Sequence, residues 1–244
     1  MTDAVETTVG GKEKYMRIQG LQKLTLLDYP GRTACTVFLS GCNFRCPFCH
    51  NAPLLTAADE DGMDEDELLA FLKKRRGLLD GVAVTGGEPL LRPDLPRILE
   101  KIKALGYAVK LDTNGAFPDR LEAVVCAGLA DYVAMDIKNS PARYAETVGV
   151  PGLDLTPVLR SVSFLLSDIV NYEFRTTAVA ELHDDTSFAQ MGDWLAGARR
   201  YYIQRFQPRD TVLRAGLSAP SEMQLHCWAE LVRPKIPTVE IRGI

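Results

Sequence analysis

The chain has 244 residues and a net charge of −4, with 46% hydrophobic and 25% charged residues. This composition is ordinary for a soluble globular protein. An acidic chain has no bulk attraction to nucleic acid or to an anionic membrane, so neither is expected as a partner. No apolar run approaches the roughly 18 residues of a membrane-spanning helix.

Residues 1–14 are polar and contain glycine, without the apolar segment of a secretory signal. They are predicted to form a flexible tail. Residues 15–244 are predicted to form a single domain, because no linker-like stretch interrupts them. Without an export signal, we expect a reducing, cytoplasmic location.

Short apolar runs then alternate with longer amphipathic segments. The runs predict strands at Cys35–Ser40, Val82–Thr85, Ala108–Asp112, Tyr132–Asp136, Glu173–Thr177 and Tyr201–Gln204. The amphipathic segments predict helices at Asp64–Arg76, Leu95–Leu105, Asp119–Ala127, Ala142–Val148, Thr156–Ser167, Thr186–Gly197 and Ser221–Val232. Nearly continuous apolar strands are typical of parallel strands covered on both faces. About six such βα units predict an α/β fold, a partial barrel with outer helices and a site at the C-terminal strand ends.

A short loop after the first predicted strand carries Cys42, Cys46 and Cys49, with the spacing C-x3-C-x2-C. Three thiolates on one loop can ligate three irons of a 4Fe–4S cluster, and the fourth iron would stay open to a small molecule. A structural zinc site needs a fourth ligand, and His50 directly follows Cys49, so it is poorly placed to converge on the same ion. The thiols could also be buried apolar side chains, which Pro47 and its polar neighbours make less plausible.

The other cysteines, Cys35, Cys126 and Cys227, are scattered in apolar contexts. We expect them to be core residues rather than ligands.

Polar motifs follow the next four predicted strands. They are Gly86-Gly87-Glu88-Pro89, Asp112-Thr113-Asn114-Gly115, Met135-Asp136-Ile137-Lys138 and Arg175-Thr176-Thr177. Each has an ordinary alternative: a glycine turn with a solvated Glu, an Asx-type turn, an exposed ion pair, and an interior Arg paired with an acid. Their placement after successive strands favours a shared site instead.

The cysteine loop followed by Gly86-Gly87-Glu88-Pro89 resembles the radical S-adenosylmethionine superfamily, over nearly the whole chain after Lys14. The segment Gly20–Gly31, running into Cys49-His50-Asn51, resembles glycyl-radical-enzyme activases. The nearest similarity is to anaerobic ribonucleoside-triphosphate reductase activating proteins. Pyruvate formate-lyase activating enzymes share segments similar to Asp112–Gly115 and Asp136–Lys138.

The resemblance implies that Cys42, Cys46 and Cys49 hold a 4Fe–4S cluster whose open iron binds the amino and carboxylate groups of S-adenosylmethionine. It also implies a pocket for this molecule, in which Phe48 lies near the adenine. The methionine amino group would be held by Gly86, Gly87 and Glu88. The methionine and ribose end would be lined by Asp112, Asp136 and Lys138, and a monovalent cation could also bind there. Arg175 would contact the carboxylate. Gln204 and the region of Phe206 would close the pocket without an assigned role.

The implied activity is reductive cleavage of S-adenosylmethionine to methionine and a 5′-deoxyadenosyl radical, which abstracts hydrogen from a glycine Cα. The partner would be a glycyl radical enzyme, and the leading candidate is anaerobic ribonucleotide reductase. Reduced flavodoxin or ferredoxin would donate the electron. The loops at the barrel mouth and the segment Gln22–Pro30 would recognise the partner. The alternatives are an activating enzyme of the pyruvate formate-lyase type, a radical enzyme acting on a small molecule, and a non-catalytic iron–sulfur protein.

Overall fold

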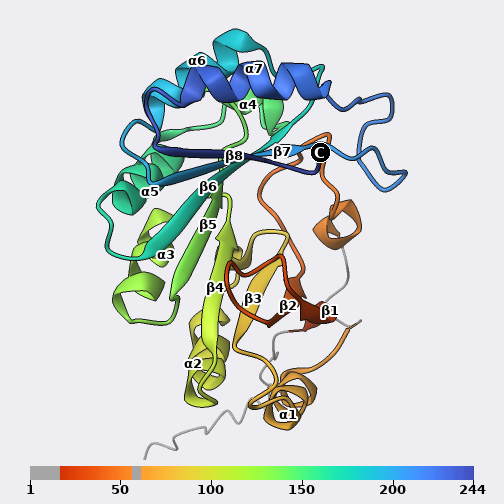
Figure 1. The fold of residues 1–244 in the computed structure, drawn as a ribbon. Coiled ribbons are helices and arrows are strands. Elements are labelled where there is room, and N and C mark those ends of the chain that lie inside the picture. The colour runs from red at the N-terminus through yellow and green to blue at the C-terminus, as the bar shows by residue number, and fades with distance from the viewer. Residues whose placement is uncertain (1–16, 57–61) are drawn as a thin grey trace, which may run out of the picture.

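The computed structural model describes residues 17–56 and 62–244, so the whole predicted tail, residues 1–14, lies outside the described residues. These residues form an eight-stranded sheet in which neighbours in sequence are neighbours in space (Figure 1). The first two strands are antiparallel, and all later neighbours are parallel. The strands are β1 (Ile18–Thr25), β2 (Ala34–Leu39), β3 (Gly81–Gly86), β4 (Ala108–Thr113), β5 (Tyr132–Asp136), β6 (Asn171–Ala178), β7 (Arg200–Arg205) and β8 (Thr238–Arg242).

The six predicted strands correspond to β2–β7, and the expected α/β partial barrel is confirmed. In Figure 1, β8 lies nearly horizontal and β4 nearly vertical, so the strand direction turns strongly from one part of the sheet to the other. Within the described residues, β1 and β8 form the two edges of the sheet and do not pair with each other. The barrel is therefore open on one side.

Both edge strands were absent from the sequence prediction. Strand β1 reads IQGLQKLT and leaves Gln22, Lys23 and Leu24 exposed, while β8 has five residues and buries only Val239 well. Edge strands face solvent along one side and need no continuous apolar run. They therefore lack the signal by which the interior strands were found.

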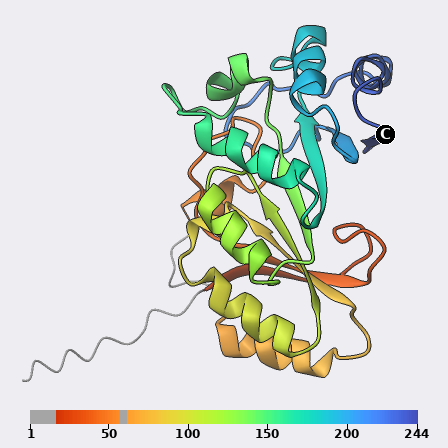
Figure 2. The ribbon, with the colours of Figure 1, turned by 90° about the vertical axis from the view of Figure 1, so that its left-hand side faces the viewer.

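Helices cover the outer face of the sheet, and Figure 2 shows α2, α3 and α5 lying side by side across it. The α-helices are α1 (Glu65–Lys74), α2 (Leu95–Ala104), α3 (Pro118–Cys126), α4 (Tyr144–Thr147), α5 (Thr156–Leu166), α6 (Asp185–Trp194) and α7 (Glu222–Val232). Single 3-10 turns lie at Ala52–Leu55, Pro89–Leu91 and Pro141–Arg143. Among the described residues, no helix combines the length and apolar character needed to cross a membrane.

The helix starts follow from local chemistry. Asp64 and Glu67 form a reciprocal capping box at α1, and Asp184 and Ser221 cap α6 and α7 through their side chains. The predicted helix Ala142–Val148 was too long, because the segment divides into a 3-10 turn and one short turn of α-helix.

The segment Gln22–Pro30, which was predicted to help recognise the partner, lies at the end of the sheet opposite the cysteine loop. Thr25 pairs with Ala34, the first residue of β2, whereas the cysteine loop follows the last residue of that strand. The connection between β1 and β2 therefore lies beyond the N-terminal ends of the parallel strands. Its Leu26 and Leu27 are 70% and 87% exposed.

Strand β8 is attached to the barrel by Arg242. Its guanidinium makes two bonds to the buried carboxylate of Glu173, at 3.0 and 3.1 Å, and lies 3.3 Å from the ring centroid of Tyr202. The hydroxyl of Tyr132 donates a third bond to Glu173, at 3.0 Å. The ion pair between Arg242 and Glu173, with its contacts to the two tyrosines, therefore links strands β5, β6, β7 and β8.

Arg242→Ala should lower the free energy of unfolding by roughly 2–3 kcal/mol, because it leaves the buried Glu173 carboxylate without its positive partner. The measurement is the midpoint of anaerobic unfolding in urea. Arg160→Ala, which removes an exposed pair with Asp119, is the control and should leave the midpoint nearly unchanged. Equal shifts in the two variants would contradict the assignment.

Candidate active site

The three cysteines of the C-x3-C-x2-C loop line one cavity of about 240 Å³ at the C-terminal ends of the parallel strands. The amide of Cys49 donates to the carbonyl of Cys46 at 3.1 Å, and the amide of Phe44 donates to the sulfur of Cys42 at 3.4 Å. The Arg45 guanidinium donates to the carbonyls of Cys42 and Phe44 at 2.7 and 2.8 Å. Part of the shape of the loop is thus fixed by bonds within the loop.

These thiols suit an iron–sulfur cluster. Burial raises the pKa of Cys46 to about 12, against the opposing charge of Lys138, and burial also raises the pKa of Cys42 and Cys49. Such thiols become thiolates when a metal coordinates them. In residues 17–56 and 62–244, no three His, Cys, Asp or Glu side chains converge on one metal ion. In a 4Fe–4S cluster each thiolate binds its own iron, so the donor set fits the cluster and leaves one iron open.

Gly86 and Gly87 bring the end of β3 against the cysteine loop. Gly86 has φ +124°, and a Cβ there would lie 2.2 Å from the carbonyl oxygen of Leu39. A Cβ on Gly87 would lie 1.9 Å from the carbonyl oxygen of Gly41. Only glycine fits such a close backbone approach. The amides of Gly87 and Glu88 then donate to Leu39 and Gly41, at 2.9 and 2.8 Å.

The side chain of Glu88 lies behind the cavity wall. Its carboxylate is fully buried and accepts three hydrogen bonds, from the amide of Leu90 at 3.0 Å, the hydroxyl of Thr113 at 2.8 Å and the amide of Asn114 at 2.6 Å. Burial raises the pKa of Glu88 to about 7, and these bonds oppose the rise. Glu88 is not among the residues that line the cavity, whereas Gly86 and Gly87 are. Its side chain joins the ends of β3 and β4.

Asn114 and Asn51 belong to the site but were not among the predicted site residues. The amide nitrogen of the Asn114 side chain lies 3.8 Å from the sulfur of Cys42 and donates to the side chain of Asn43 at 2.9 Å. The side chain of Asn51 donates to the carbonyl of Gly86 at 2.8 Å. Asn51 lies two residues after Cys49, and Asn114 lies two residues after Asp112. This closeness to predicted site residues was the sequence signal that could have identified both asparagines.

A row of alternating charges lines the cavity across β4, β5 and β6. Arg175 donates to Asp136 at 2.9 Å and to Asp112 at 3.2 Å. Lys138 donates to the other oxygen of Asp136 at 3.0 Å, and the buried Lys110 pairs with Asp112. Arg175 therefore pairs with acids inside the barrel, as its ordinary alternative proposed, and it also lines the cavity.

These partners keep the row ionised. Burial raises the pKa of Asp136, but the charges of Arg175 and Lys138 outweigh it and hold that pKa at about 2. Arg175 and Lys110 likewise outweigh burial at Asp112 and lower its pKa. Burial lowers the pKa of Lys138, but the neighbouring charge of Asp136 outweighs this effect and raises that pKa above its usual value. The cavity thus presents fixed charges of both signs.

Aromatic and amide side chains form the rest of the wall. Phe48 and Gln204 both line the cavity. His50 also lines it and stacks on Phe206, with ring centroids 5.4 Å apart. The ring nitrogen Nε2 of His50 lies 2.8 Å from the carbonyl oxygen of Gln207, which accepts a hydrogen bond from it. The structure therefore brings the predicted Gln204 and Phe206 region to the cavity, with Phe206 behind His50.

The prediction that the remaining cysteines are core residues is wrong for two of the three. Cys35 is buried in β2, but Cys126 in α3 and Cys227 in α7 are exposed. Each exposed cysteine belongs to an amphipathic helix whose buried positions are taken by other apolar residues. An apolar neighbourhood in sequence does not determine which helix face a residue occupies.

Comparison with known proteins identifies relatives of this arrangement. The family model of the Radical SAM superfamily matches residues 36–167, more than half of the chain. A protein of Methanocaldococcus jannaschii, provisionally named a glycyl-radical enzyme activating enzyme, is 30% identical over 93% of this chain and 96% of its own length. The pyruvate formate-lyase-activating enzyme of Clostridium pasteurianum is 35% identical over 50% of this chain and 52% of its own. The 7-carboxy-7-deazaguanine synthase of Hyperthermus butylicus is 35% identical over 48% and 47%.

Solved structures share the fold at low identity. A domain of pyruvate-formate lyase-activating enzyme from Bacteroides vulgatus matches 67% of this chain and 99% of that chain, with a TM-score of 0.55 and 19% identity. SuiB from Streptococcus suis, bound to S-adenosylmethionine, matches 83% of this chain and 48% of that chain, with a TM-score of 0.67 and 12% identity.

Cys42→Ala, Cys46→Ala and Cys49→Ala should each prevent assembly of the cluster, because each removes the only protein ligand of one iron. Iron and sulfide analysis with electron paramagnetic resonance after anaerobic reconstitution measures this. Cys126→Ala and Cys227→Ala are matched controls that keep the cluster. A stable cluster in all three loop variants, or stoichiometric zinc in place of iron, would refute the assignment.

Gly87→Ala should also reduce cluster content, although it changes no ligand, because its Cβ would displace the backbone at Gly41, the residue before Cys42. Gly192→Ala in α6 is the control, since a Cβ there meets its nearest atom at an ordinary 3.4 Å. Iron content per protein, measured after identical reconstitution, should fall in the first variant alone. Full iron content in Gly87→Ala would show that the close approach is dispensable.

Proposed function

Because the chain belongs to the radical S-adenosylmethionine superfamily, we propose that it is the activase that generates a glycyl radical on an anaerobic ribonucleoside-triphosphate reductase. Its cofactors are a 4Fe–4S cluster and S-adenosylmethionine. When bound, the cluster supplies the electron that breaks the bond between sulfur and C5′ of S-adenosylmethionine. The protein positions these groups and excludes water.

The length of the similarity is the observation that carries the activase proposal. The relative provisionally named an activating enzyme is matched along nearly the whole of both chains. The 7-carboxy-7-deazaguanine synthase is matched along about half of each. A match over the full length includes the outer loops, where recognition of a substrate is built. This favours a protein substrate over a small molecule.

The size of the cavity supports the same choice. Pockets that enclose a small molecule typically measure about 300–1,000 Å³, and this cavity of about 240 Å³ is lined mainly by the cysteine loop and the strand-end motifs. A cluster and S-adenosylmethionine together exceed that volume, so they would fill the cavity and extend out of its mouth. A further substrate must then approach from outside, which suits a glycine-bearing loop of a partner enzyme at the open side of the barrel.

The side chains have distinct tasks in this proposal. Cys42, Cys46 and Cys49 hold three irons, and the close glycine backbone at the end of β3 leaves room for the methionine part beside them. Lys138 and Arg175 keep Asp136 ionised, so that its carboxylate can orient ribose hydroxyls or the ammonium group. Rigid placement of the reacting bond beside the cluster lowers the barrier, because the cost of orienting the reacting groups is met on binding.

The reductase proposal is tested by anaerobic incubation of the reconstituted protein, a reductant and S-adenosylmethionine with the reductase of the same organism. We expect 5′-deoxyadenosine, methionine and the electron paramagnetic resonance doublet of a glycine Cα radical. The Cys46→Ala variant is the negative control. A signal on a pyruvate formate-lyase homologue alone would establish that type of activase instead. Consumption of a small metabolite without any glycyl radical would refute the activase proposal.

A further inference from the structure

We propose that residues 207–216, the loop between β7 and α7, form with Arg45 the docking surface of an acidic one-electron carrier protein. This inference rests on the proposed function, because reductive cleavage needs an electron from outside the chain. Cys35, Cys126 and Cys227 lie in three separate elements, one in a strand and two in helices, so they do not form a second redox centre. The donor must therefore approach close to the cysteine loop.

The loop 207–216 is tied at two points to neighbours of the cluster cysteines. The carbonyl of Gln207 accepts a hydrogen bond from His50, which follows Cys49 in sequence. The amide of Arg214 donates to the carbonyl of Pro47 at 2.9 Å, and Pro47 follows Cys46. The chain between these two bonds thus passes over the outside of the cysteine loop. All its residues are exposed except Val212, which is partly buried.

This region is positively charged in a chain of net charge −4. Residues 40–56 and 204–220 contain Arg45, Arg205, Arg209 and Arg214 and one carboxylate, that of Asp210. A second carboxylate, that of Glu181, bonds to Ser218 and interacts with the charge of Arg214, so the arginines still outnumber the acids. Arg45, Arg209 and Arg214 are exposed. A positive surface beside a redox centre attracts an acidic protein and orients it during encounter. The exposed Leu213 adds an apolar contact between the two loop arginines.

The same contacts provide a short path for the electron. From a carrier seated on the loop, the path runs through the bond between Arg214 and Pro47 and then along the main chain to Cys46. The carrier, a reduced flavin or iron–sulfur protein, loses one electron, and the cluster held by the cysteines gains it. No covalent bond forms or breaks in this step.

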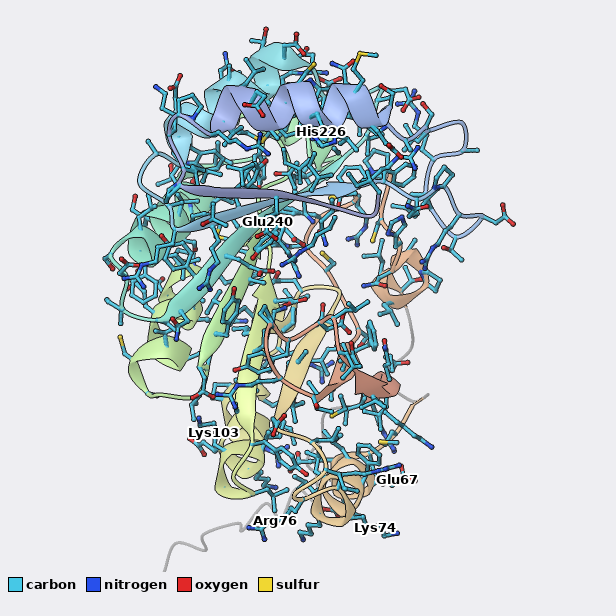
Figure 3. The ribbon with its side chains drawn as sticks, in the orientation of Figure 1. Glu67, Lys74, Arg76, Lys103, His226 and Glu240 are labelled. Atoms are coloured by element: carbon cyan, nitrogen blue, oxygen red, sulfur yellow. The ribbon has the colours of Figure 1, made fainter. Side chains whose placement is uncertain are left out.

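The first test is direct binding. A purified acidic flavodoxin is titrated into the reconstituted holoprotein by calorimetry, for the wild type and for the double variant Arg209→Glu, Arg214→Glu. We expect the dissociation constant to rise roughly tenfold or more in the variant, and wild-type binding to weaken steeply with added salt. The control is Lys73→Glu, Lys74→Glu, which changes the net charge equally. Figure 3 shows Lys74 on α1, at the far end of the molecule from β7 and α7.

The second test separates the electron donor from the catalytic site. Cleavage of S-adenosylmethionine is measured with reduced flavodoxin and, separately, with excess dithionite, a small reductant that needs no docking surface. The loop variant should lose roughly tenfold or more of its flavodoxin-driven rate and keep its dithionite-driven rate and iron content. The control variant should keep both rates.

Each other outcome has a defined meaning. Unchanged flavodoxin binding and rate in the loop variant would overturn the docking proposal, with the proposed function intact. A variant that cleaves S-adenosylmethionine normally with both reductants but forms less glycyl radical would assign the loop to the partner enzyme, and would also overturn it. Failure of the wild type to form any glycyl radical, with flavodoxin-driven cleavage still dependent on the loop, would refute only the activase function.

Discussion

The site depends on the contact between the end of β3 and the start of the cysteine loop. Gly86 and Gly87 lie so close to Leu39 and Gly41 that a single methyl group would separate them. Glu88 then fixes this contact from behind, because its buried carboxylate holds the end of β4 through Thr113 and Asn114. The cysteine loop is thereby positioned by two neighbouring strands rather than by its own sequence alone.

A second constraint is charge balance inside the barrel. Placing isolated charges in a buried cavity is costly, and the alternation of Lys110, Asp112, Arg175, Asp136 and Lys138 gives every charge an opposite neighbour. The same alternation keeps the groups that face the cavity ionised and held by fixed bonds. A charged ligand such as S-adenosylmethionine therefore meets a surface that is already oriented, which reduces the cost of reorganisation on binding.

The two ends of the sheet serve different purposes. The C-terminal strand ends carry the cavity and its basic border, where the loop 207–216 is bonded to residues beside Cys46 and Cys49. The opposite end carries the connection between β1 and β2, whose Leu26 and Leu27 are exposed. This separation follows from parallel topology, since all the parallel strands β2–β8 point their carboxyl ends the same way.

Local pattern determined much of this protein. The spacing of Cys42, Cys46 and Cys49, the glycine pair and the apolar strand runs were enough to predict an α/β partial barrel, its interior strands and most of the residues around the cavity. Only the tertiary structure decided which way each side chain faces. The side chain of Glu88 is buried against the end of β4, which its motif did not indicate, and Cys126 was expected in the core but is exposed. The edge strands β1 and β8 and the contact between Arg214 and Pro47 were likewise invisible in sequence, because pairing at a sheet edge and bonds between distant loops depend on where the rest of the chain lies.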